Sequence, residues 1–322
     1  MKFMAKLFWN ADESRVRALW RLIGFFVIFS VILLIVGILS QMITGQTAPA
    51  GEPITLPMYA VTLMSLLAVW LAGRFLDRRR FAEFGFLFNK QWWIDFVAGL
   101  ILSAALMLII FLIELAAGWI TITGAFVTSR AGDAFSTAIL AVLVRFIFVG
   151  IYEELVFRGY LLTNLAESFN GKRISPRWAI IIATLLSSML FGLAHASNPH
   201  ATLLSTFNIL LAGIFMALAY LLTGQLAIPI ALHISWNFFQ GNVFGFPVSG
   251  TSANQTSFIA ITQGGPELWT GGAFGPEAGL LGFITTVLGC ILIVWWVRWR
   301  YGRVSLHTAI AEPPISTVDK AA

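Results

Sequence analysis

Long apolar segments follow one another along the whole chain and are separated by short polar stretches. A helix needs about 20 apolar residues to cross a bilayer. Eight segments reach this length or come close to it: 22–43, 57–73, 96–120, 136–165, 178–195, 203–222, 226–246 and 278–297. The pattern therefore predicts an all-α, polytopic membrane helical bundle with about eight transmembrane helices.

Lys and Arg residues flank these segments and predict their orientation. They gather in four short stretches: 1–21, 74–90, 171–177 and 298–303. Residues 44–55 and 247–277, by contrast, contain neither. Because cytoplasmic loops of membrane proteins carry an excess of Lys and Arg, we expect both termini in the cytoplasm. The expected location is the cell membrane, as an integral multi-pass protein.

The polar stretches divide the chain into six parts. We expect a basic cytoplasmic lead-in at 1–21, N-terminal transmembrane helices at 22–135, a motif-bearing helical core at 136–246, an extracytoplasmic loop at 247–277, a last transmembrane helix at 278–300 and a disordered tail at 301–322. The loop is rich in Gly, Ser, Thr and Asn, which predicts a mobile segment.

Composition supports a membrane protein and argues against a soluble domain, a nucleic-acid-binding protein and a cysteine-rich protein. Hydrophobic residues make up 58% of the chain and charged residues 11%, whereas about a quarter of a soluble domain is charged. The net charge of +5 comes from clusters beside apolar segments, so it indicates membrane topology. We expect the lipid bilayer as a partner and no nucleic acid. The single cysteine, Cys290, leaves no disulfide framework and no cysteine-rich metal site in this chain.

Three ionisable side chains interrupt the fourth segment, in the octapeptide YEELVFRG at residues 152–159. A charge near the centre of a bilayer costs about 2.5–3.5 kcal/mol on insertion scales, so such residues usually face a bundle interior and serve a function. Glu154 and Arg158 are spaced for an ion pair on one helix face, with the acid first. Glu153 is turned about 100° from Glu154. A purely structural ion pair would need only one of the two glutamates.

Two further polar motifs interrupt apolar segments. FGLAH at 191–195 closes the fifth segment, and HISWN at 233–237 lies early in the seventh. Each His alone is often only an interhelical hydrogen bond. Together, the three motifs supply the acid, base and amide donors of a hydrolytic site. Glu153, His195 and His233 can equally hold a zinc ion with an open position for water.

Signatures of other enzyme classes are missing from the sequence. There is no His-Glu-x-x-His motif of a zinc protease, no Gly-x-Ser-Gly motif of a serine protease and no Gly-x-Gly-Asp motif of an aspartyl protease. Asp-rich clusters, which hold magnesium and diphosphate in membrane prenyltransferases, are absent as well. Phosphate chemistry is therefore not expected.

The motifs EExxxR at 153–158, FxxxH at 191–195 and HxxxN at 233–237, in this order on separate segments, resemble those of the CPBP family. This family contains the type II CAAX prenyl endopeptidases and their bacteriocin-processing and self-immunity (Abi-like) relatives. The resemblance covers about residues 136–240. It implies an intramembrane endopeptidase that hydrolyses peptide bonds of membrane-associated substrates, either CAAX-type or bacteriocin leader peptides. The expected partner is a peptide or protein substrate at the membrane, and a prenylated one is among the candidates.

The resemblance also implies a role for each motif residue. Glu153 would activate the attacking water with help from His195. His233 and Asn237 would stabilise the oxyanion, and the Glu154–Arg158 pair would orient the site. The family has been described as metalloproteases, but its geometry also suits a glutamate mechanism without metal. We expect no required cofactor, with zinc as the alternative.

Two functions from other classes remain open. The ionisable residues of the three motifs can form the proton relay of a proton-coupled membrane transporter. The sequence shows no internal repeat or matched pair of broken helices that would support a transporter. The chain can also be a non-catalytic membrane scaffold of the same family.

Three further expectations concern side-chain placement. Arg145 is expected to snorkel toward the outer surface and Asn208 to form an interhelical hydrogen bond. With a rise of about 1.5 Å per residue, straight helices would place His195 near the outer end of its span and Glu153 in the cytoplasmic half. The two side chains can then meet only if a helix is tilted or displaced.

Overall fold

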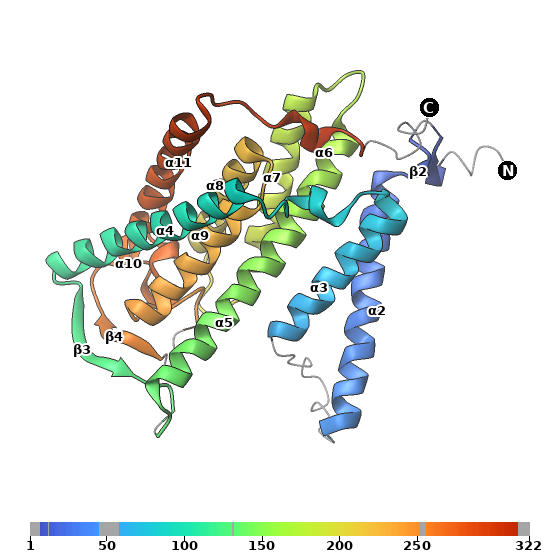
Figure 1. Cartoon of the computed structure of the whole chain (residues 1–322). Helices are drawn as coiled ribbons and strands as arrows, with labels where there is room; N and C mark the ends of the chain where they lie inside the picture. Colours follow the sequence, from blue (N-terminus) through green and yellow to red (C-terminus); the bar gives the residue numbers. More distant parts are fainter. Residues whose placement is uncertain (1–6, 12, 45–57, 131, 252–255, 315–322) are drawn as a thin grey trace.

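The computed structural model describes residues 7–11, 13–44, 58–130, 132–251 and 256–314. Long helices make up most of this part of the chain, as Figure 1 shows. They are α2 (Ala18–Thr44), α3 (Met58–Ala72), α4 (Lys90–Ala116), α5 (Phe135–Glu154), α6 (Thr163–Phe169), α7 (Pro176–Ala194), α8 (Leu203–Thr223), α9 (Ala227–Phe238) and α11 (Leu280–Tyr301). Among the described residues, seven helices are long and apolar enough to cross a membrane. The prediction of a polytopic helical bundle is confirmed, and the protein is an integral multi-pass membrane protein.

Several helices continue through wider, π-helical turns. Helix α3 runs on into Gly73–Asp77, and α9 runs on into Phe239–Val243. The fourth predicted segment is one continuous span, Phe135–Phe169, in which the π-helical stretch Leu155–Leu162 joins α5 to α6. Such turns are frequent at functional sites. This stretch begins directly after Glu154, inside the motif that carries the charges.

The seventh predicted segment contains the short helix α9, which lies inside the bundle. Residues 227–235 are all buried. A Cβ atom at Gly99 of α4 would meet the Cβ of Ala231 at 2.8 Å, and one at Gly150 of α5 would meet Ile234 at 2.7 Å. Because small residues let helix backbones approach closely, α9 is held between α4 and α5.

Local sequence signals set the ends of the neighbouring helices. Pro176 stands in the first turn of α7, where its missing N–H costs no hydrogen bond. Thr202 and Ser205 form a capping box at the start of α8. Gly224 ends α8 with a φ of 69°, which glycine adopts without strain. A tight turn therefore connects α8 to α9.

A small antiparallel sheet covers the end of the bundle opposite the α6–α7 loop (Figure 1). Strand β3 (Ile120–Val127) pairs with β4 (Ser257–Gln263). The segment predicted to be a mobile loop at 247–277 contains, among its described residues, strand β4 and the short helix α10 (Glu267–Thr270), so it has more regular structure than predicted. Local sequence could not predict this sheet, because its two strands are far apart in the chain.

Buried ion pairs tie the basic lead-in to the helical bundle. Strands β1 (Trp9–Asn10) and β2 (Arg15–Val16) form a second small sheet, so the all-α prediction omitted two strand pairs. Glu167 of α6 binds three arginines: Arg15 at 2.6 Å, Arg21 at 3.0 Å and Arg79 at 2.5 Å. Residues of the lead-in are therefore part of the folded protein as well as topology signals.

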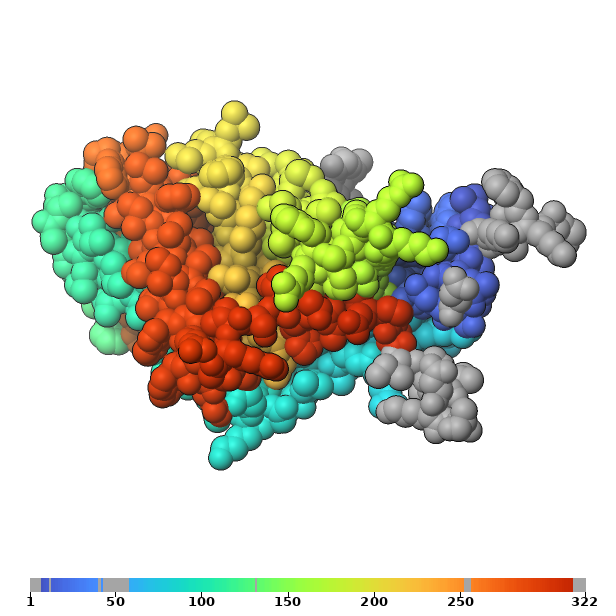
Figure 2. All heavy atoms as spheres, turned by 90° about the horizontal axis from the view of Figure 1, so that it is seen from above, coloured from blue at the N-terminus to red at the C-terminus, as the bar shows by residue number. Residues whose placement is uncertain are grey.

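The tail, predicted to be disordered from residue 301, is folded as far as residue 314. The 3-10 turn Thr308–Ala311 lies on α6 and α7, with Ile310 and Ala311 buried. Figure 2 shows this segment in red, lying across the yellow-green α6–α7 region. Arg79 also donates a hydrogen bond to the backbone oxygen of Glu312 at 2.9 Å. The rest of the predicted tail, 315–322, lies outside the described residues.

Both described ends of the chain therefore meet at one end of the bundle, which agrees with a common side for both termini. The assignment of that side to the cytoplasm stays a prediction from the basic residues.

Candidate active site

The ion pair predicted within the fourth segment is present and buried. Arg158 Nη1 donates to Glu154 Oε1 at 2.7 Å, and both side chains are almost fully excluded from the surface. Arg158 Nη2 also donates to the backbone oxygen of Gly213 in α8 at 3.2 Å. The guanidinium carbon lies 4.3 Å from the ring centre of Phe191. Arg158 therefore joins α7 and α8 to the helix that carries the glutamates.

His233 lies between the two glutamates. Its Nδ1 atom is 2.7 Å from Glu154 Oε1, and its Nε2 atom is 3.7 Å from Glu153 Oε2. Because a carboxylate only accepts, Nδ1 carries the proton in the first contact. The carboxylates of Glu153 and Glu154 carry two negative charges, and the Arg158 guanidinium balances one of them. A doubly protonated His233 would balance the other.

The two carboxylate oxygens of Glu153 have different surroundings. The hydroxyl of Tyr152 donates to Glu153 Oε1 at 2.7 Å. The second oxygen, Oε2, is buried and accepts no hydrogen bond from the described residues. A buried carboxylate oxygen without a donor needs a partner such as water or substrate. Glu154 Oε2 also lacks a hydrogen-bond partner among the described residues, so the two glutamates differ in their other oxygen: Glu154 Oε1 serves both Arg158 and His233, whereas Glu153 Oε1 accepts from Tyr152.

His195 is oriented by its own helix end. It caps the C-terminus of α7, and its Nδ1 atom lies 2.8 Å from the backbone oxygen of Phe191. A carbonyl oxygen only accepts, so Nδ1 carries a hydrogen, and in the neutral imidazole Nε2 then carries the lone pair. The turn that follows α7 is covered by a later segment, since Asn198 donates to the backbone oxygen of Ser249 at 3.1 Å. His195 therefore lies beneath a folded cover rather than at an open outer surface.

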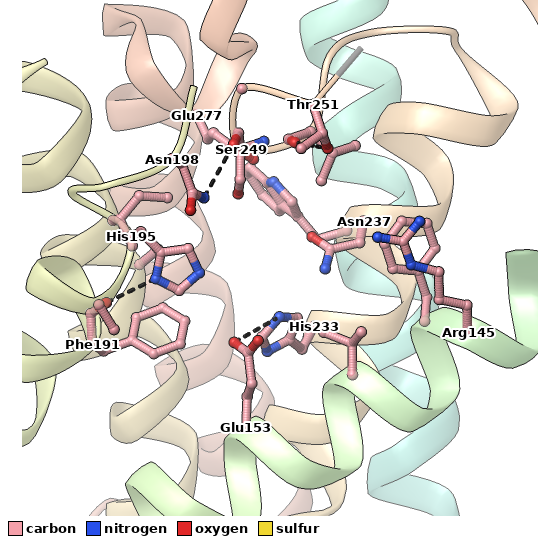
Figure 3. A pocket seen from close by; sticks show the side chains of 18 of the residues that line it. Arg145, Glu153, Phe191, His195, Asn198, His233, Asn237, Ser249, Thr251 and Glu277 are labelled. Atoms are coloured by element: carbon pink, nitrogen blue, oxygen red, sulfur yellow. Dashed lines mark hydrogen bonds and ion pairs between the residues drawn. The ribbon is translucent and has the colours of Figure 1, made fainter. Parts of the chain in front are cut away.

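The three motifs meet at one cavity of about 940 Å³. Four of the six predicted residues line it: Glu153, His195, His233 and Asn237. Figure 3 shows these side chains arranged around the same space. Glu154 and Arg158 are not among its lining residues; Glu154 contacts the lining residue His233, and Arg158 contacts the lining residue Phe191. His195 and Glu153 thus border the same space, although straight helices were predicted to place them at different depths.

Sequence analysis missed Glu277, a further buried carboxyl group in the cavity wall. The backbone N–H of Ser249 donates to Glu277 Oε1, and the side chain is only 7% exposed. Burial raises the pKa of Glu277 above its ordinary value, although hydrogen bonds from Ser249 and Gln240 oppose that shift. Glu277 follows a Gly-rich stretch without a motif, so no local pattern identified it.

Two other polar residues of the spans also line the cavity. Asn208 forms the expected interhelical contact, donating to the backbone oxygen of Gly279 at 3.1 Å. Arg145 was expected to snorkel toward the outer surface; its side chain is exposed, and it also borders the cavity (Figure 3). The helix-wheel angle between Arg145 and Glu153 did not predict this, because a long side chain can reach around the helix.

The three residues named for the alternative zinc site do not come together as one ligand group. Glu153 Oε2 lies 3.7 Å from His233 Nε2, and the bond from His195 Nδ1 to a backbone oxygen leaves Nε2 as the nitrogen of that ring that could bind a metal. In the described part of the chain, no group of three His, Cys, Asp or Glu side chains is arranged to hold a metal ion. We therefore derive no catalytic step through a metal.

Comparisons with known proteins match the part of the chain that carries the motifs. The family described as "Type II CAAX prenyl endopeptidase Rce1-like" matches residues 135–239. The "Membrane-embedded CAAX protease MroQ" of Staphylococcus aureus (strain USA300) is 38% identical over 89 residues, which are 28% of this chain and 33% of the relative. An "Uncharacterized 24.3 kDa protein" of Escherichia coli is 30% identical over 104 residues, 32% of this chain and 44% of the relative. The chain thus spans less than half the length of either relative.

No solved structure matches the chain. The matched segment begins with α5, which carries the two glutamates, and reaches past Asn237 of α9. It therefore contains all three motifs on which the predicted resemblance depends. Over residues 135–239, the predicted resemblance of this chain to the type II CAAX prenyl endopeptidases is confirmed as a match to their Rce1-like family.

Proposed function

We propose that this protein is an intramembrane endopeptidase that hydrolyses peptide bonds of membrane-associated substrates with water activated by Glu153. The observation that carries the proposal is the convergence of Glu153, His195, His233 and Asn237 on one cavity. The similarity of residues 135–239 to prenyl endopeptidases supports the same class of reaction.

Two proton acceptors from different helices are available to a water molecule in this cavity. Glu153 Oε2 has no hydrogen-bond donor among the described residues, and His195 Nε2 carries a lone pair. A water that donates to both presents its own lone pair to a peptide carbonyl carbon. Glu153 takes a proton from the water as the hydroxide adds to the carbon. It returns a proton to the amine nitrogen when the C–N bond breaks.

Two hydrogen-bond donors on α9 complete the reaction. Protonated His233 can donate from Nε2, because its Nδ1–H remains bonded to Glu154. Asn237 lies one helical turn further along α9 and can donate from its amide nitrogen. Donors positioned for the developing oxyanion stabilise the tetrahedral intermediate. Glu154 and Arg158 act as positioning residues, because they fix the imidazole of His233.

The proposed substrate is a peptide or protein segment at the lipid bilayer. The cavity combines the polar groups of the motifs with apolar walls that include Phe157, Ile209 and Phe215, which suits a peptide with apolar side chains. The Staphylococcus relative is named a CAAX protease. We extend that substrate class to this chain, with a prenylated C-terminal peptide as the first candidate and a bacteriocin leader peptide as the second.

The central test replaces Glu153 with Gln, which keeps the shape of the side chain but cannot take a proton. We expect Glu153→Gln to lower cleavage by about 10²–10⁴-fold, the usual contribution of a general base. The measurement is cleavage of a library of quenched-fluorescent peptides, with and without a prenyl group, by protein in lipid nanodiscs. Cleavage by the folded variant at the wild-type rate and bond would contradict the proposal.

A second measurement concerns the cofactor. We expect no requirement for metal, so a chelator should leave cleavage unchanged and elemental analysis should find no stoichiometric zinc. Activity that is lost on chelation and restored by zinc would instead favour a metallopeptidase that uses Glu153, His195 and His233. A wild-type protein that cleaves none of the peptides, but takes up protons together with a solute in vesicles, would favour a transporter.

A further inference from the structure

Arg145 is a cation without a partner in the membrane-spanning part of the protein. It lies within α5, and its side chain is exposed. In the described part of the chain it forms no ion pair or hydrogen bond, and its only aromatic contact is with the adjacent Phe146, at 5.9 Å. The buried arginines Arg15, Arg79 and Arg158 each bind a carboxylate at 2.7 Å or less. A charged residue within a span is costly, so an unpaired one indicates a functional role.

The position of Arg145 connects it to the proposed active site. It is the only Lys or Arg among the described residues that line the cavity. Figure 3 shows its side chain on the same side of the cavity as Asn237. Met58 and Ser129 line the cavity as well and come from other elements, so Arg145 belongs to a wall built by several parts of the chain. A substrate that fills this space would contact the guanidinium and shield it from water.

We infer that Arg145 determines specificity by binding a carboxylate of the substrate, either a free C-terminus or an Asp or Glu side chain. The inference rests on the proposed function, because it concerns the substrate of the same site. A guanidinium binds a carboxylate through two parallel hydrogen bonds, which gives both strength and orientation. The cavity wall provides no competing acid at Arg145, since no carboxylate of the described residues pairs with it.

The spacing along α5 limits where this carboxylate lies in the substrate. Arg145 and Glu153 are about two helical turns apart, or about 12 Å along the axis. An extended peptide advances about 3.3–3.6 Å per residue. With allowance for the length of the Arg side chain, the carboxylate lies about two to five residues from the bond that is cleaved.

The test compares peptides that differ only in charge. One pair has a free C-terminal carboxylate or a C-terminal amide, and further pairs have Asp or Asn at each of the positions two to five residues from the cleaved bond. We expect the wild type to prefer the anionic peptide by about 10- to 100-fold in kcat/KM, the range for hydrogen bonds to a charged group. Arg145→Ala should bring this ratio close to one, and Arg145→Glu should favour a peptide with Lys at the same position. If Arg145 binds the C-terminal carboxylate, the kcat/KM ratio of the first pair depends on Arg145. If Arg145 binds an acidic side chain, the ratio of one Asp–Asn pair depends on it instead.

A matched control removes a cation outside the cavity. Arg130 is exposed and does not line the cavity, so Arg130→Ala should keep the wild-type preference. A wild type that cleaves both members of every pair equally would overturn the inference. The same conclusion follows if Arg145→Ala discriminates as the wild type does.

A binding measurement separates this inference from the proposed function. Fluorescein-labelled peptides of the same pairs are titrated into Glu153→Gln and into Glu153→Gln/Arg145→Ala, and Kd is read from anisotropy without any turnover. A preference for the anionic peptide that disappears with Arg145 supports the inference even if no peptide is cleaved. Equal Kd values for both peptides, together with retention of phosphatidylglycerol that depends on Arg145, would assign the residue to lipid and overturn the inference.

Discussion

Asn237 is the residue of the proposed site whose role is easiest to separate from substrate binding. It lines the cavity one helical turn from His233, and its amide can donate to an oxyanion. We expect Asn237→Ala to lower kcat by about 10²–10³-fold with little change in KM, because the oxyanion exists only in the transition state. Steady-state kinetics on the best peptide measure both values. A change confined to KM would show that Asn237 only binds substrate.

The buried Glu154–Arg158 pair allows stability and activity to be separated. Glu154→Gln leaves Arg158 buried without its counter-ion, so we expect the free energy of unfolding to fall by about 3–5 kcal/mol. Glu154→Gln/Arg158→Met removes both charges and should recover much of that loss, because no unpaired charge remains buried. Activity should stay low in both variants, since His233 has lost the carboxylate that fixes its Nδ1–H.

Thermal unfolding in nanodiscs and peptide cleavage provide the two measurements for this pair. Activity that returns together with stability in the double variant would contradict a positioning role for Glu154. It would leave the ion pair as a structural element only.

Glu277 predicts a pH dependence of stability. Burial raises the pKa of Glu277 above its ordinary value of 4.5, with His195 and the Ser249 and Gln240 hydrogen bonds acting in the opposite direction. The folded state therefore binds this proton more tightly than the unfolded state does. Its contribution to stability is present below about pH 4.5 and is lost as pH rises through the folded pKa.

Unfolding of the wild type and Glu277→Gln, compared from pH 4 to pH 8, measures this contribution. We expect the wild type to lose stability relative to the variant as pH rises, because Gln does not titrate. A difference between the two proteins that is constant across this range would contradict the prediction.

At the scale of the helices, the contact between α5 and α9 sets the position of His233. A Cβ at Gly150 would meet Ile234 at 2.7 Å and the backbone oxygen of Ile230 at 3.2 Å. We expect Gly150→Val to push α9 away from α5, lower the melting temperature and reduce cleavage, because His233 and Asn237 move with α9. Gly171→Ala is the control, since nothing lies within 4 Å of its added Cβ. Wild-type activity and stability in Gly150→Val would show that this contact does not position the site.

At the scale of the whole molecule, the ion pairs of Glu167 and the folded tail bring both described ends of the chain to one end of the bundle. In a Cys290→Ala background, we expect Lys172→Cys, in the α6–α7 loop, to react only from the cytoplasm with a membrane-impermeant thiol reagent. Thr123→Cys, in β3 at the opposite end, should react only from outside. Both positions are exposed. Labelling of both from the same side, or the reverse pattern, would contradict the predicted topology.

The sequence alone determined the membrane class, seven of the eight predicted long helices, the buried pair of Glu154 and Arg158 and the resemblance carried by the three motifs. These features depend on local properties: the length of apolar segments, the helical period and the spacing of charges within one helix. Such properties can be read without knowing which helices touch.

Only the tertiary structure decided how the side chains meet. Glu153 lines the cavity while Glu154 binds His233, which Gly99 and Gly150 bring close by letting α9 lie between α4 and α5. The segment 247–277 folds over the end of α7 and adds Glu277 to the wall. The buried tail and the arginines around Glu167 depend on contacts between distant parts of the chain. Their positions were beyond prediction, because a contact between distant residues leaves no periodic signal in the sequence.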